Sequence, residues 1–152
     1  MSDRPIIFQD GRIEADTWYH LDEVTLAEDP SNATVPLGRF LESETSFGGV
    51  RLPNTAPVDS LMGKLDDVKL VTIDFPRFTD GRGYTLARDL RVRLNYTGEL
   101  RAVGDITRDQ LLYLSRCGFD AYVLKEGKNP HDALKAFQEQ SIRYQPELEL
   151  AV

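Results

Sequence analysis

Apolar and polar residues follow a regular pattern along the second half of the chain. Apolar runs at 70–75, 100–103 and 121–124 are typical of buried strands, and helical spacings of apolar residues follow each run. The residues with these helical spacings are Leu86, Leu90 and Leu94, then Leu111, Leu112 and Leu114, then Ala133, Leu134 and Phe137. Alternating strands and helices predict βαβ units with right-handed crossovers and a parallel sheet. The pattern is compatible with either an open three-layer sheet or a partial barrel.

Capping residues support two of these helices. Thr107 is a predicted N-cap, and Gly118 occupies the position of a left-handed residue after a helix. Asn129 and Pro130 stand in the preferred N-cap and N1 order for the last helix.

The first half of the chain has a weaker pattern. Residues 6–8 predict a strand and residues 13–19 a second one, with a turn at Asp10-Gly11. Residues 35–37 and 48–52 predict short strand pieces, and Val58, Leu61, Met62 and Leu65 predict an amphipathic helix. We expect one α/β domain over residues 1–152, with residues 1–32 as a β-containing N-terminal extension packed on it.

Charge narrows the classes of partner. The net charge of −7 argues against nucleic acid or an anionic membrane as a partner. Residues 70–124 nevertheless hold eight arginines, no lysine and seven acidic residues. This balance suits the binding of a small anion, and the alternative is that most of these arginines lie on solvated helix faces.

The absence of several motifs bears on the cellular location and the cofactors of the protein. The first residues lack the apolar core of a signal peptide, and no run approaches the ~20 apolar residues of a membrane span. With Cys117 as the single cysteine, the sequence predicts a cytoplasmic protein without a disulfide. We expect no cofactor and no metal, because flavin, haem, iron–sulfur and phosphate-loop motifs are absent, and two histidines with one cysteine are a poor zinc set.

The candidate site lies in the loops that follow the predicted strands, where parallel α/β folds bind ligands. Its polar groups are Arg77, Asp80, Arg82, Asp105 and Arg108. Arginine forks and helix N-termini both suit carboxylate, phosphate or sulfur oxyanions. The alternative is that the Asp80-Gly81 pair forms a tight turn and that the arginines pair with neighbouring acids.

Arg101 is unusual because it falls within a strand that we expect to be covered on both faces. Asp74 on the preceding strand and Glu99 on its own strand are alternative partners. A structural ion pair and a pocket-lining arginine are both open, so Arg101 joins the candidate anion site.

Three blocks resemble the bacterial family called domain of unknown function 934. They are residues 75–84, residues 98–105, and residues 108–111 with 116–120; the strongest similarity covers 70–124. The resemblance implies a protein encoded beside sulfite reductase, often labelled a probable oxidoreductase of sulfite reduction, with no established active site.

Three functions remain open at this point. The first is an accessory protein of assimilatory sulfur metabolism that binds a partner enzyme, such as sulfite reductase, or a small oxyanion. The second is an enzyme that uses Asp80, Asp105 and the nearby arginines on a phosphorylated or sulfur-containing anion. The third is a structural α/β domain that forms a homodimer.

Overall fold

A computed structural model describes residues 4–77 and 79–150, with side chains to residue 142. Its centre is an eight-stranded sheet in the order β2-β1-β8-β7-β6-β5-β4-β3. The strands are β1 (Ile6–Phe8), β2 (Ile13–Glu14), β3 (Tyr19–His20), β4 (Ala33–Pro36), β5 (Gly49–Leu52), β6 (Leu70–Phe75), β7 (Glu99–Gly104) and β8 (Ala121–Val123). Strands β3 to β8 are parallel, whereas β1 runs antiparallel to both β8 and β2.

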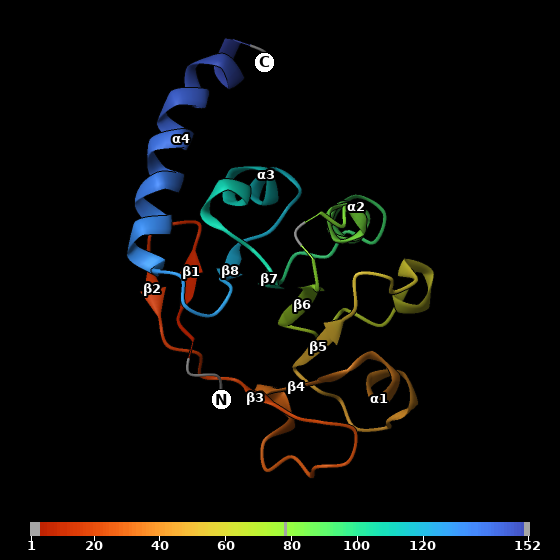
Figure 1. Ribbon diagram of the computed structural model, residues 1–152. Helices are drawn as coiled ribbons and strands as arrows, with labels where there is room; N and C mark the ends of the chain where they lie inside the picture. The colour runs from red at the N-terminus through yellow and green to blue at the C-terminus, as the bar shows by residue number, and fades with distance from the viewer. Residues whose placement is uncertain (1–3, 78, 151–152) are drawn as a thin grey trace.

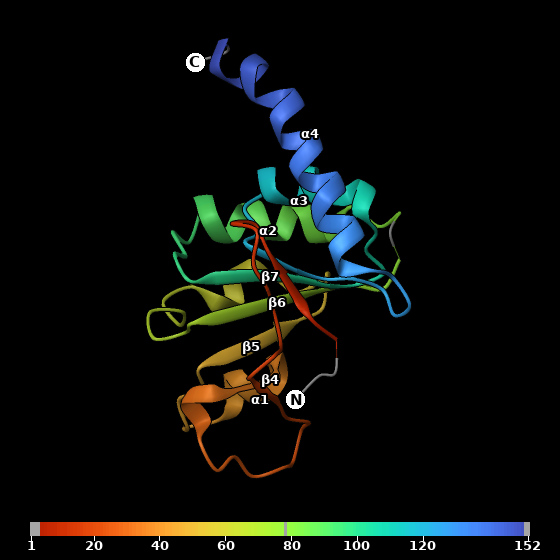
Figure 2. The same ribbon diagram turned by 90° about the vertical axis from the view of Figure 1, so that its left-hand side faces the viewer.

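The sheet curls into a half-barrel, and the helices lie on its convex side (Figure 1). The helices are α1 (Leu37–Glu42), α2 (Arg82–Val92), α3 (Leu111–Arg116) and α4 (Pro130–Leu150), with 3-10 turns η1 (Pro30–Asn32), η2 (Val58–Leu61) and η3 (Arg108–Gln110). Figure 2 shows α2 and α3 together on one side of β6 and β7. Of the two predicted architectures, the partial barrel is therefore the one observed.

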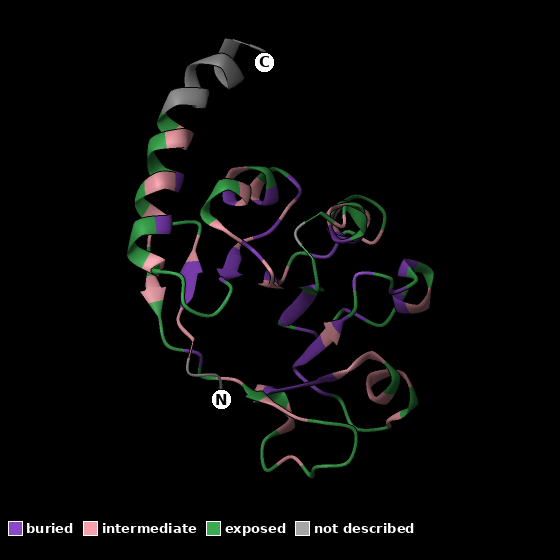
Figure 3. Ribbon diagram, in the orientation of Figure 1, coloured by how far each residue is buried: buried purple, intermediate pink, exposed green. Residues whose placement is uncertain are grey.

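Strand alternation divides the side chains between the two faces. In β6, Val71, Ile73 and Phe75 point to the convex side and join the main apolar core with helix residues. Thr72 and Asp74, the residues between them, point to the concave side, where they line a cavity. Figure 3 shows the buried residues concentrated along the strands, with exposed residues on the outer surfaces of the helices. The helices thus stabilise one face of the sheet and leave the other available.

The N-terminal segment extends the sheet at both edges. β1 and β2 form the predicted hairpin beside β8, and Gly11 adopts a positive φ of 103° in its turn. The predicted strand at 13–19 is wrong as one element: it ends at Glu14, and the chain then crosses the open side of the half-barrel to pair as β3 with β4 (Figure 1). We call the crossing residues 15–18 the strap. The strap brings residues from outside the βα units over the concave face.

Of the remaining predictions for local structure, one is wrong and the others are confirmed. The amphipathic helix expected after Pro57 is wrong: only the 3-10 turn η2 forms there, and Met62 is exposed. The capping predictions are confirmed, since Thr107 and Gln110 form a capping box and Asn129 Oδ1 accepts from the backbone N–H of His131. Gly118 has the expected positive φ of 113°. Among the described helices, none combines the length and apolar character needed to cross a membrane.

Candidate ligand-binding cavity on the concave face

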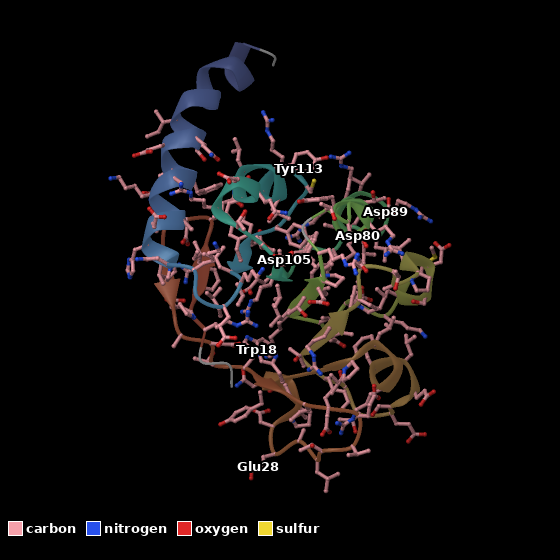
Figure 4. The ribbon with its side chains drawn as sticks, viewed as in Figure 1. Trp18, Glu28, Asp80, Asp89, Asp105 and Tyr113 are labelled. Atoms are coloured by element: carbon pink, nitrogen blue, oxygen red, sulfur yellow. The ribbon has the colours of Figure 1, made fainter. Side chains whose placement is uncertain are left out.

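The concave face holds a cavity of about 380 Å³. Its wall combines charged, polar and apolar side chains from the sheet, the strap and the N-terminal segment. The lining residues are Arg4, Asp16, His20, Pro36, Arg51, Leu52, Pro53, Thr72, Asp74, Arg101, Val103 and Val123. Figure 4 shows side chains projecting into the space enclosed by the curled sheet.

Strand register places two arginines in one row across the floor of the cavity. Arg51 of β5 is level with Thr72 of β6, and Thr72 is level with Arg101 of β7. Neighbouring strands lie about 4.8 Å apart, so the two arginine Cα atoms are roughly 10 Å apart with Thr72 between them. A charge that is buried in this row is costly unless it is paired or hydrogen-bonded.

Arg101 has its counter-charges within the protein. Its Nη2 lies 2.7 Å from the Glu99 carboxylate and its Nη1 3.5 Å from Asp16, with a side chain only 3% exposed. Of the two predicted partners, Glu99 is observed, whereas Asp74 forms no recorded ion pair with Arg101 within the described residues. At Arg101 the strand is covered on both faces, as expected, because the strap lies over its concave side; the same side chain also lines the cavity. Arg101 is therefore both ion-paired and pocket-lining.

The strap is attached to the sheet through Asp16. Its Oδ2 lies 2.5 Å from His20 Nε2, and its Oδ1 accepts from the backbone N–H of Trp18. Burial by itself would raise the pKa of Asp16, but the hydrogen bonds from His20 and Trp18 and the nearby Arg101 charge lower it overall. Asp16 thus remains a carboxylate and fixes the strap over the cavity.

His20 is fully engaged in this network. Because a carboxylate only accepts, Nε2 carries the proton shared with Asp16, and Nδ1 lies 2.6 Å from the Thr34 hydroxyl. Neither ring nitrogen is left for a substrate. These two contacts fix the orientation of the His20 ring.

Arg51 has a different environment from Arg101. It donates to the Thr34 carbonyl at 2.9 Å, to the Thr34 hydroxyl at 2.8 Å and to the Leu21 carbonyl at 2.5 Å, all uncharged acceptors. Burial lowers the pKa of Arg51, while Glu23 and Asp22 oppose this shift from a longer range. Within the described residues no carboxylate lies within 4.0 Å of its guanidinium. Arg51 thus presents to the cavity a partly buried positive charge whose position is fixed by these hydrogen bonds.

Asp74 is the unpaired acid of the cavity. Among the described residues, no hydrogen bond or ion pair to its carboxylate is recorded, and burial by the cavity walls raises its pKa although solvent reaches it. Strand β6 positions this carboxylate two residues beyond Thr72, toward the end of the strand where Val103 and Val123 form an apolar row with it. The cavity therefore contains the positive charge of Arg51 and, two residues farther along the strand direction, the carboxylate of Asp74.

The structure separates most of the predicted loop site from this cavity. Arg82 folds back onto Asp80 with Nη2–Oδ2 at 2.6 Å, while its side chain stays 63% exposed. This pair, together with the backbone N–H of Arg82, holds the pKa of Asp80 well below its usual range. Arg77 is exposed in the same loop, at a turn where the Asp80 N–H donates to its carbonyl. Asp80 and Arg82 thus correspond to the tight turn and local ion pair of the alternative interpretation.

Packing explains Phe75 and Gly83, at the two ends of that loop, without a ligand. Phe75 is fully buried, and its ring makes a tilted contact with Tyr84 and an edge-to-face contact with Phe119. A Cβ on Gly83 would lie 2.5 Å from the Phe75 ring, so glycine lets α2 approach β6 closely.

The other two loop residues lie in separate surface pairs. Asp105 lies 3.5 Å from Lys125, and Arg108 lies 3.0 Å from Asp132 at the start of α4. Figure 4 shows Asp105 after β7 and Asp80 beside α2, on different loops. Of the six predicted residues, only Arg101 lines the concave cavity.

Sequence reasoning missed Asp16, His20, Arg51 and Asp74 as a group. The available signal for Arg51 was a charge in the short predicted strand at 48–52, equivalent to the anomaly that identified Arg101. Asp16 and His20 gave no signal, because the strap becomes visible only when the sheet curls.

The fold and the cavity define a class: an α/β half-barrel protein with helices on the convex side and a charged cavity on the concave side. The model of the family described as "Bacterial protein of unknown function (DUF934)" matches residues 49–151, and the chain belongs to this family. Comparison with curated proteins gives no match. The family match covers β5 to α4 and so includes Arg51, Asp74 and Arg101, whereas the strap lies before it.

Proposed function

We propose that this protein binds a small organic anion in the concave cavity, with the anionic group at Arg51. The observation that carries the proposal is that Arg51 is fixed by three hydrogen bonds to uncharged acceptors and has no ion-paired carboxylate among the described residues. Holding a partly buried cation without a counter-ion costs free energy. A bound carboxylate, sulfonate or phosphate would supply the missing charge through the guanidinium fork.

Cavity size favours an organic molecule over a bare oxyanion. The volume of about 380 Å³ falls in the range of roughly 300–1,000 Å³ that is typical of small-molecule pockets. A bare sulfite or sulfate ion would leave most of this space to water. Val103 and Val123 offer apolar contact for a carbon chain beside the polar row.

Binding is better supported than catalysis at the residues considered for an enzyme. Asp80 and Asp105 are paired with Arg82 and Lys125, and His20 is engaged through both ring nitrogens. A free general base among these groups is therefore not part of the proposal.

The resemblance to domain of unknown function 934 supports a role as an accessory protein of assimilatory sulfur metabolism. On this proposal the anion is a sulfur-containing one, which makes an alkyl sulfonate the first probe. The linked proposal of a partner enzyme is tested by co-purification with sulfite reductase at micromolar concentrations of both proteins; no complex at these concentrations would contradict it.

The binding experiment is calorimetric titration with butane-1-sulfonate. Hydrogen bonds to charged groups contribute about 1.5–3 kcal/mol, so Arg51→Gln should weaken binding by roughly 10- to 100-fold. Arg51→Lys, which keeps the charge, should lose less. The matched control is Arg82→Gln, an exposed arginine of the loop, which should bind like wild type. Unchanged binding by a folded Arg51→Gln, or loss in Arg82→Gln instead, would refute the proposal.

A further inference from the structure

The carboxylate of Asp74 is a second polar group in the cavity with no assigned task. It lines the same wall as Arg51, and the described residues provide it with neither a hydrogen bond nor an ion pair. The acids nearest to the polar row behave differently: Asp16 and Glu99 both pair with Arg101. The positive charge of Arg101 is therefore balanced by Asp16 and Glu99 and not by Asp74.

The relative positions of Asp74 and Arg51 follow from the register. Arg51 is level with Thr72, and Asp74 lies two residues farther along β6. Neighbouring strands are about 4.8 Å apart, and two residues along a strand span about 6.6 Å. The Cα atoms of Arg51 and Asp74 are therefore roughly 8 Å apart. The Arg51 guanidinium reaches away from Asp74, toward Thr34 and Leu21. The two charged groups thus lie in different parts of one cavity.

Apolar surface lies next to Asp74. Val103 is level with Asp74, and Val123 is level with Val103, so one row holds the carboxylate and two valines. Both valines belong to an apolar cluster with Ile6 and Ala121 on the concave side. Since β6 lies between β5 and β7, this row runs from Asp74 away from Arg51, and it offers apolar contact beside the Asp74 end of a ligand.

We infer that the ligand is a small zwitterion, with an anionic group bound at Arg51 and an ammonium group bound at Asp74. This inference rests on the proposed function, because it assigns the second end of the same ligand. An ammonium fits better than a hydroxyl group, because a carboxylate at a partly dehydrated wall gains more from a cation than from a neutral donor. The raised pKa of Asp74 through burial is the expected property of an acid that lacks this cation.

The test compares three probes of one chain length: 4-aminobutane-1-sulfonate, butane-1-sulfonate and 4-hydroxybutane-1-sulfonate. Wild type should bind the amine about 10-fold or more tightly than butane-1-sulfonate. In Asp74→Asn this preference of the amine over butane-1-sulfonate should fall to near one. The control is Asp105→Asn, a loop carboxylate paired with Lys125, which should keep the preference.

Three results would overturn the inference. If butane-1-sulfonate binds through Arg51 but the amine binds no better, the zwitterion is wrong and the proposed function stands. If the hydroxyl compound binds as tightly as the amine, Asp74 selects a neutral donor and the zwitterion is again wrong. If no probe shows Arg51-dependent binding, both proposals fail together.

Discussion

The two faces of the central strands differ more than any other two regions of this molecule. On the convex side, Val71, Ile73 and Phe75 of β6 are fully buried under helices. On the concave side, the same strand presents Thr72 and Asp74 to a cavity shared with charged residues of β5 and β7. One face is organised for packing, and the other retains charges that packing does not require.

This difference between the two faces indicates that a ligand would bind on the concave side of the sheet. Apolar burial contributes roughly 25 cal/mol per Å² of surface removed from water, whereas unpaired or partly buried charge opposes folding. Residues that are unfavourable for stability and remain within a cavity are candidates for binding. The substitutions below test whether the two faces really have these separate roles.

The largest effect is expected on the convex face. Phe75→Ala should destabilise the fold by about 3–5 kcal/mol, because it removes a fully buried ring that contacts Tyr84 and Phe119. Urea denaturation measures the change. A loss below about 1 kcal/mol would show that this face is not the main source of stability.

Arg101 should give the second largest effect, from the concave face. Arg101→Met leaves Asp16 and Glu99 without their shared cation, and breaking a buried pair in this way typically costs about 3 kcal/mol. In a double-mutant cycle with Asp16→Asn, the two losses should be non-additive by about 0.5 kcal/mol or more. Strict additivity would mean that the Asp16–Arg101 contact does not fix the strap.

Asp16 should give an acid-dependent effect of intermediate size. Its pKa is lowered in the folded protein, so its contribution is present above the unfolded value of 3.8 and is lost as the pH falls through the folded pKa. Asp16→Asn should cost about 1.5–3 kcal/mol at pH 7, the range for hydrogen bonds to a charged group. Denaturation at several pH values between 6 and 3 should show the difference shrinking at the acid end; a constant difference would contradict this assignment.

The smallest effect has the opposite sign. The pKa of Asp74 is raised, so the folded state holds its proton more tightly, and stability from this group falls as the pH rises above 3.8. Asp74→Asn should therefore raise the melting temperature at pH 7 by about 1–2 °C, and the gain should disappear below pH 3.8. A lower melting temperature at pH 7 would assign Asp74 a structural role.

The sequence predicted the convex half of this comparison well. Apolar runs, leucine spacing and caps such as Thr107 and Gly118 are local signals, and the strands β6 to β8 with their helices form as expected. Strands of parallel sheets are normally covered on both faces, which is the expectation for the strand of Arg101. The sequence does not show that the cover of the concave face leaves a cavity.

The concave half depends on curvature and long-range pairing. Asp16 meets Arg101 across 85 positions of the chain, and His20 reaches Thr34 only because β3 pairs with β4. No local spacing predicts such contacts. The Asp80 and Arg82 pair is the opposite case, since these two charges are close in sequence and form an ion pair with one another.

The most direct test of the central claim is a crystal of the protein soaked with butane-1-sulfonate. We expect sulfonate density on the concave face, within hydrogen-bonding distance of the Arg51 guanidinium, with the carbon chain toward Val103 and Val123. Density beside Arg77 and Arg82 in the loop after β6, with a concave cavity that holds only water, would contradict it.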